Sequence, residues 1–142
     1  MMDYVESVFK ELNLETFHTD YQVLLSFPDY DKPNTIEYYD ENNSKWITVS
    51  HGLSEVVGEG ECADQQRADK RARVQWLSFA PPGQVEAPLV YANYGNPSDF
   101  DYLFDSSAVD VRGKIVLCRY GNGSRAHKVL EAQKRGAIGV LW

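Results

Sequence analysis

The chain has 142 residues, of which 43% are hydrophobic and 25% are charged, so it has enough apolar residues for the core of one ordinary domain. Its formal net charge is -7 at pH 7. This acidity argues against nucleic acid as a partner, because binding phosphates requires a continuous basic surface. No run of residues approaches the ~20 apolar residues of a membrane-spanning helix. The first residues also show neither the basic nor the apolar region of a signal peptide.

A helix and a buried strand are the first predicted elements. Apolar side chains recur at intervals of three and four residues over 4–14, which predicts an amphipathic helix with Asp3 as its N-cap. The apolar run Tyr21–Phe27, closed by Pro28, predicts a strand that is too apolar for the edge of a sheet.

A β-hairpin and a less regular stretch follow. Strands are expected over 35–39 and 45–49, and the polar turn 40–44 between them predicts a hairpin. Residues 50–73 are glycine-rich at first and charged later. We expect a helix over 63–73.

Another strand and a short helix come next. After the rigid turn at residues 80–83, the apolar residues 89–92 predict a strand. A helix is expected over 99–104, with Ser98 or Asp99 as its N-cap.

The final stretch predicts a β-α-β unit. A strand over 115–118 precedes a glycine-rich loop and a helix over 125–135, and residues 137–142 start another strand. One side of this predicted helix is formed by Ala126, Val129, Leu130 and Gln133. Parallel strands of such units are buried on both faces, and the last strand would lack its outer neighbour. We therefore expect the chain to be the front part of a larger protein and to be marginally stable without the rest.

No group of residues has the pattern of a catalytic centre. His18 and Asp20 have the His-x-Asp spacing of zinc hydrolases, but no further histidine or carboxylate pair supports a site, so we interpret them as a polar turn. The loop 121–124 lacks the lysine-serine pair of a phosphate-binding loop and is interpreted as a plain strand-to-helix connection. His51 and His127 have no serine or cysteine partner. The sequence therefore predicts neither catalytic nor metal-ligating residues in this chain.

Two cysteines and two glycosylation triplets complete the candidate residues. Cys62 and Cys118 either pair or stay free, and their surroundings do not suggest zinc. Asn42 and Asn122 fit the N-glycosylation rule. Asn42 is the better candidate, because it lies in a hairpin turn that should be exposed.

Three stretches of the sequence occur in the order of one known family. They are YQVLLSFP (21–28), FAPPG with LVYANYG (79–83 and 89–95), and GKIVLCRYG (113–121), the last continuing through Arg125, Lys128, Ala132, Gly136, Ala137, Gly139 and Val140. They resemble the glutamate carboxypeptidase II group, also called the N-acetylated alpha-linked acidic dipeptidases, which includes the catalytically inactive transferrin receptors. The resemblance covers residues 9–54 and 76–142, whereas residues 55–75 match poorly and are either a divergent insertion or a gene-model error.

The resemblance implies an α/β fold in two parts. Residues 1–28 would be the helix and strand that open a zinc-peptidase domain. Residues 29–142 would be a protease-associated domain, a mixed β-sheet with flanking helices, incomplete at its C-terminal end. It further implies that the zinc ligands and the catalytic glutamate of the full-length protein lie beyond Trp142, so that His18 is not a ligand and zinc is a cofactor only of the complete enzyme.

The resemblance also indicates an edge of a substrate cleft at Tyr94 and Asn96. In glutamate-selective members an arginine in the loop after this strand contacts the substrate carboxylate, and the matching position here is Asn96. An asparagine donates a hydrogen bond but cannot form a bidentate charged clamp. The sequence therefore argues against selectivity for a C-terminal glutamate.

The functional expectation is a non-catalytic accessory part of a zinc exopeptidase, which shapes the substrate cleft and packs on the peptidase domain of the same polypeptide. The resemblance implies a homodimeric full-length protein, a peptide substrate at the cleft edge, and an extracellular or membrane-anchored location. The alternative is the ectodomain of an inactive transferrin receptor-like binding protein. A free-standing protease-associated domain of a sorting receptor is a third interpretation, against which the strand Tyr21–Phe27 argues.

Overall fold

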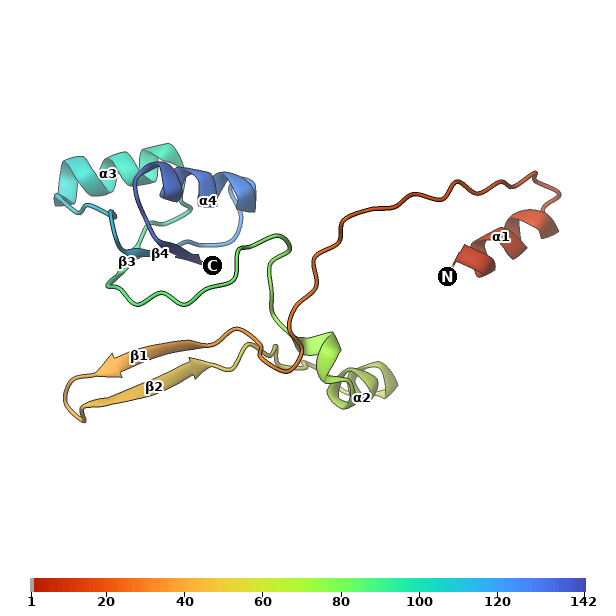
Figure 1. Cartoon of the computed structure of the whole chain (residues 1–142), viewed down its shortest axis with the longest axis horizontal. Coiled ribbons are helices and arrows are strands. Elements are labelled where there is room, and N and C mark those ends of the chain that lie inside the picture. The colour runs from red at the N-terminus through yellow and green to blue at the C-terminus, as the bar shows by residue number, and fades with distance from the viewer. Residues whose placement is uncertain (1) are drawn as a thin grey trace. The chain divides into compact units, whose positions relative to one another are not determined.

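The computed structural model describes residues 2–142, which group into two compact units, one up to Ala80 and one from Pro81 to Trp142. The first unit contains helices and a hairpin, and the second contains a parallel sheet with two helices (Figure 1). The elements are α1 (Met2–Glu11), β1 (Ile36–Asp40), β2 (Lys45–Ser50), α2 (Glu61–Ala68), the 3-10 helix η1 (Lys70–Arg73), β3 (Leu89–Tyr91), α3 (Pro97–Ser107), β4 (Ile115–Leu117), α4 (Arg125–Lys134) and β5 (Gly139–Leu141).

Helix α1 is shorter at its C-terminal end than its apolar pattern predicts. The chain turns at Asn13, which has a left-handed backbone (φ 56°), and the Leu14 N–H donates to the Phe9 carbonyl at 2.9 Å. These are features of a helix C-cap. The predicted N-cap was wrong as well, because Asp3 lies inside the first turn.

The strand predicted over Tyr21–Phe27 is absent from the structure, which gives this segment no regular secondary structure. Its apolar side chains are exposed, and Leu24 is 85% accessible. A strand requires a partner for its backbone N–H and C=O groups, and no other segment among residues 2–142 pairs with this one. The apolar pattern alone therefore could not produce the strand.

The predicted hairpin is confirmed. Strands β1 and β2 are antiparallel, and the rings of Tyr39 and Trp46 meet edge to face with their centroids 5.5 Å apart. In the turn, the Asp40 carboxylate accepts hydrogen bonds from the Asn42 N–H at 3.0 Å and the Asn43 side-chain amide at 2.6 Å.

The helix predicted over 63–73 is divided at Asp69, whose backbone is extended. Its carboxylate accepts from the Arg71 N–H and from the Arg71 guanidinium, each at 3.0 Å. Because this local hydrogen bonding competes with the helical pattern, the helix ends at Ala68 and resumes as η1.

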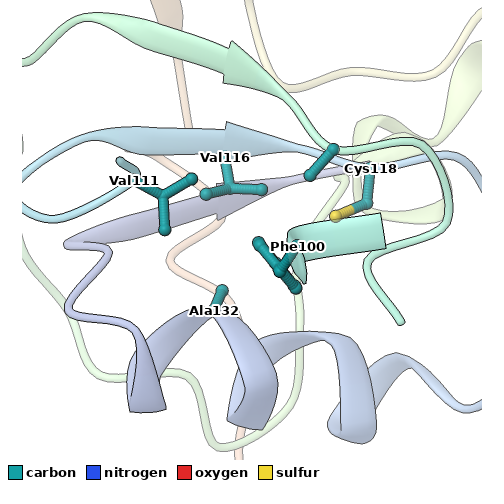
Figure 2. Close-up of a cluster of buried hydrophobic side chains, with 6 residues drawn as sticks. Phe100, Val111, Val116, Cys118 and Ala132 are labelled. Carbon is teal, nitrogen blue, oxygen red and sulfur yellow. The ribbon is translucent and has the colours of Figure 1, made fainter. Parts of the chain in front are cut away.

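The β-α-β unit is confirmed in the second unit, where β3, β4 and β5 form a parallel sheet in that order. Both α3 and α4 lie on one side of it (Figure 1). Figure 2 shows Val116 of β4, Phe100 of α3 and Ala132 of α4 gathered between these layers. The cluster consists of Ala92, Phe100, Val111, Val116, Cys118 and Ala132.

The opposite face of the sheet is open, in contrast to the expectation that the strands are buried on both faces. Leu89 and Tyr91 of β3 are 56% and 53% exposed. Only one layer of helices covers the sheet, so alternate residues of β3 remain exposed, whereas those of β4 and β5 are half-buried.

An ion-pair cluster joins the C-terminal end of α4 to α3. The buried Glu131 carboxylate lies 2.8 Å from the Lys134 ammonium and 2.6 Å from the Arg135 guanidinium. Hydrogen bonds from Lys134 and Arg135 lower the pKa of Glu131 from 4.5 to about 2. The same guanidinium reaches Asp101 of α3 at 3.1 Å and lies over the Phe100 ring at 4.8 Å.

This cluster predicts a specific pH dependence of stability. The pKa of Glu131 is depressed in the folded state, so its stabilising effect is present above pH 4.5 and is lost as the pH falls toward 2. Urea unfolding at pH 6 and pH 3 should show that Glu131→Gln loses less stability than the wild type over this interval. Glu86→Gln, at an exposed site ahead of β3, is the matched control and should behave like the wild type. Equal losses in Glu131→Gln and the wild type would contradict this assignment.

Candidate functional site

The predicted cleft-edge residues lie at the carboxyl ends of the parallel strands. Tyr94 and Asn96 belong to the loop between β3 and α3, and Asn122 belongs to the neighbouring loop between β4 and α4. This is the edge of an α/β sheet at which ligands commonly bind. The structure therefore places both predicted cleft-edge residues in one loop and the predicted glycosylation site Asn122 in the adjacent loop.

The β3–α3 loop is held by the Asp99 side chain. Its carboxylate accepts from the Asn96 N–H at 3.0 Å and from the Asn93 side-chain amide at 2.9 Å. Asn96 is the N-cap of α3 and is followed by Pro97 in the first turn, so α3 begins earlier than the predicted cap at Ser98 or Asp99. Because Asp99 is the third helical residue, its bond to the Asn96 N–H is half of a capping box.

Gly95 allows the loop to approach β4 closely. It has a left-handed backbone (φ 66°), and a Cβ at this position would lie 2.7 Å from the Cys118 sulfur. The Gly95 N–H donates to the Ala92 carbonyl at 2.7 Å. Only glycine fits both the conformation and the space.

The Tyr94 ring is flanked by two cations. The Arg119 guanidinium lies 4.9 Å from its centroid and the Lys128 ammonium lies 5.5 Å from it, both within the range of a cation-π interaction. A Cβ at Gly121 would lie 3.8 Å from the same ring. Tyr94 therefore packs against the β4–α4 loop.

Lys128 is a buried residue at this edge that the sequence analysis did not assign to the site. It is 1% exposed, and its ammonium donates to the Tyr94 carbonyl and, at 2.7 Å, to the Gly121 carbonyl. The side of α4 that contains Ala126 and Leu130, which the apolar pattern singled out, is not the buried side, since Leu130 is 46% exposed. The buried side instead follows a spacing of three and four through Lys128, Glu131, Ala132 and the half-buried Arg135. Three of these four residues are charged, so a search for apolar residues at helical spacing does not find this side.

Two concavities lie beside these loops. One of about 660 Å³ is lined by the β4–α4 loop, Arg125 and Lys128 of α4, and Trp142. The other, of about 460 Å³, is lined by residues 91–93 and by Asp99, Tyr102 and Leu103. Neither concavity is lined by Tyr94 or Asn96.

No catalytic set gathers at this edge. Within residues 2–142, no three His, Cys, Asp or Glu side chains are close enough to hold a metal ion. The Cys118 thiol is buried, and burial raises its pKa, which opposes the thiolate needed for nucleophilic attack. His18 lies elsewhere, in the first unit, where it contacts Glu6 at 3.0 Å.

The remaining predicted residues have clear positions. Asn42 is exposed in the hairpin turn, as expected, and Asn122 is also exposed in its loop. Cys62 and Cys118 are both free in the structure of residues 2–142. Each described helix is too short or too polar to cross a lipid bilayer.

Comparisons with known proteins match both the fold and the predicted family. The PA domain family model matches residues 85–142. The chain is 41% identical over 138 residues to Glutamate carboxypeptidase 2 homolog of Caenorhabditis briggsae, covering 96% of this chain and 17% of that protein. It is 34% identical over 129 residues to Aminopeptidase NAALADL1 of Rattus norvegicus, covering 90% and 16%. Transferrin receptor protein 2 of Homo sapiens is 32% identical over 138 residues, covering 96% and 15%.

The second unit is thus a PA domain, with an α/β fold in which two helices cover one face of a parallel sheet. The chain belongs to the glutamate carboxypeptidase II family, which includes transferrin receptor-like relatives. It spans about a sixth of the length of these curated relatives.

The close approach at Gly95 can be measured against a matched glycine. Gly95→Ala and Gly113→Ala both place alanine at a φ near +70°, which costs roughly 1–2 kcal/mol. Only Gly95→Ala also adds a clash, because a Cβ at Gly113 meets no atom within 4 Å. Urea unfolding should therefore show a larger loss of stability for Gly95→Ala, by roughly 1–3 kcal/mol. Adding Cys118→Ala should recover part of that difference, and equal losses for the two glycine variants would refute the close packing.

Proposed function

We propose that this chain is a non-catalytic accessory part of a glutamate carboxypeptidase-like zinc exopeptidase. In the full-length protein, the β3–α3 loop with Tyr94 and Asn96 forms an edge of the substrate cleft, and the PA domain packs on the peptidase domain. The observation that supports the proposal is the joining of the two loops at the carboxyl ends of the strands by Lys128, beside a concavity of about 660 Å³. The family membership supports the reaction class.

Zinc is the cofactor that this proposal assigns to the complete enzyme. The donor set within residues 2–142 does not fit the ion, because no three ligating side chains gather there, whereas zinc sites use three or four protein ligands. The ion would be held outside these residues. In the full-length enzyme it supplies a Lewis acid and an activated water.

The cleft edge of this protein would not select a C-terminal glutamate. Asn96 is half-buried and neutral, and its N–H is already bonded to Asp99. The Arg119 guanidinium of the neighbouring loop lies over the Tyr94 ring. Without a charged fork at position 96, a substrate carboxylate would be bound weakly there.

The remaining features of the proposal concern the complete protein. It is extracellular or membrane-anchored, homodimeric, and glycosylated at Asn42 in preference to Asn122. The second candidate function is a transferrin receptor-like ectodomain that binds protein partners, and the similarity to Transferrin receptor protein 2 favours it as the alternative. Zinc content and peptide hydrolysis of the full-length protein distinguish the two.

Asn96→Arg tests the cleft edge directly. In the full-length protein, the new guanidinium should lower KM for peptides ending in glutamate by about tenfold, the effect of one charge-assisted hydrogen bond. The kcat should change little, because the interaction is made in the ground state and the transition state alike. Hydrolysis kinetics with peptides ending in glutamate and in alanine provide the measurement.

Ser106→Arg is the control, since it adds the same charge at an exposed position of α3 away from the loop. It should leave KM for both peptides unchanged. If Asn96→Arg and Ser106→Arg alter KM equally, position 96 does not face the substrate. If the zinc-loaded full-length protein hydrolyses no peptide, the receptor-like alternative holds.

A further inference from the structure

The ammonium of Lys128 is buried in a position where a charge is costly. The side chain is 1% exposed, and removing a charged group from water is unfavourable unless hydrogen bonds replace the lost hydration. Two backbone carbonyls provide this replacement, those of Tyr94 and Gly121. An apolar side chain at this position would fill the space without that cost, so the ammonium has a role beyond packing.

These two carbonyls belong to different loops. Tyr94 lies in the β3–α3 loop and Gly121 lies in the β4–α4 loop, so one cation joins both loops to α4. The Lys128 stem passes close to Gly95, where a Cβ would lie 3.4 Å from that of Lys128. The Arg119 N–H adds a second tie by donating to the Asn93 carbonyl at 2.6 Å.

We propose that Lys128 is a positioning residue that fixes the β3–α3 loop, and with it Tyr94 and Asn96, relative to the β4–α4 loop. It acts through backbone carbonyls and has no direct contact with substrate. The effect of this positioning on substrate binding rests on the proposed function. The hydrogen bonds that join the two loops are independent of it.

Lysine suits this role for a geometric reason. Its ammonium is compact and directs three donors in different directions, so it can serve two carbonyls on separate loops while its stem crosses the apolar interior. Asp99 is the carboxylate that faces this region, and it is already bonded to Asn93 and Asn96. Lys128 is therefore matched by carbonyl dipoles and not by an ion-pair partner.

Amide hydrogen exchange of the chain in Lys128→Met tests the tie without any assay of activity. Methionine keeps an unbranched stem and removes the ammonium. The Gly95 and Arg119 amides, which donate within and between the loops, should exchange about tenfold faster or more. The Cys118 amide, which donates to the Leu141 carbonyl at 2.8 Å within the sheet, should be unchanged. Lys114→Met is the control, because it removes the same charge at a half-buried site just ahead of β4, outside the two loops.

Faster exchange confined to the two loops in Lys128→Met would support the proposal. Uniform acceleration in the sheet and the loops, or no acceleration at all, would overturn it. If Lys128→Met does not fold, the wild-type ammonium gives the answer through ¹⁵N NMR. Slowly exchanging Lys128 protons with couplings to the two carbonyls support the tie, and protons that exchange as fast as those of Lys114 overturn it.

Kinetics of the full-length protein separate this inference from the proposed function. If the loop faces substrate, Lys128→Met should raise KM severalfold while kcat is retained. A full-length protein that hydrolyses no peptide would end the proposed function and leave the exchange result valid. Unchanged KM in an active enzyme, despite mobile loops, would end the link between the tie and the substrate.

Discussion

The buried ammonium of Lys128 and the carbonyls of Tyr94 and Gly121 form the contact on which the candidate site depends. The loops at the carboxyl end of a parallel sheet leave the strands separately, and backbone pairing in the sheet does not determine how they lie beside each other. The Lys128 ammonium, which is hydrogen-bonded to a carbonyl of each loop, fixes the position of the two loops relative to each other. The absence of side-chain bulk at Gly95 lets the β3–α3 loop come near enough to β4 for this contact.

Apolar packing and ion pairs hold α4, and with it Lys128, against the sheet and α3. Helix α4 lies over the sheet through Ala132, in the same cluster as Val116 (Figure 2). At its C-terminal end, Arg135 holds Glu131 and Asp101 and so connects α4 to α3. The Asp99 carboxylate then fixes where α3 begins. Charged groups therefore hold both ends of α4, and apolar side chains pack between them.

Local patterns predicted much of this fold and little of the site. The hairpin β1–β2 and the β-α-β unit were predicted correctly, because turn residues and apolar runs specify them locally. The strand predicted over Tyr21–Phe27 is absent because a strand needs a pairing partner, and the apolar pattern does not show whether one is present. The buried side of α4 was missed because charged residues such as Lys128, Glu131 and Arg135 usually lie in solvent. Only the fold shows the ion pairs and hydrogen bonds that compensate for their burial. Tyr94 and Asn96 came from family resemblance, and their mutual placement from the structure.

The central claim is that the loop held by Lys128 faces a bound substrate. A photoreactive p-benzoylphenylalanine at position 96 of the full-length protein, irradiated with a peptide substrate, tests this most directly. The account predicts a covalent adduct between residue 96 and the peptide, competed by unlabelled substrate, and none from the same group at Ser106 on the exposed surface of α3. An enzyme that still hydrolyses the peptide but forms no adduct at position 96, or forms equal amounts at both positions, would contradict it.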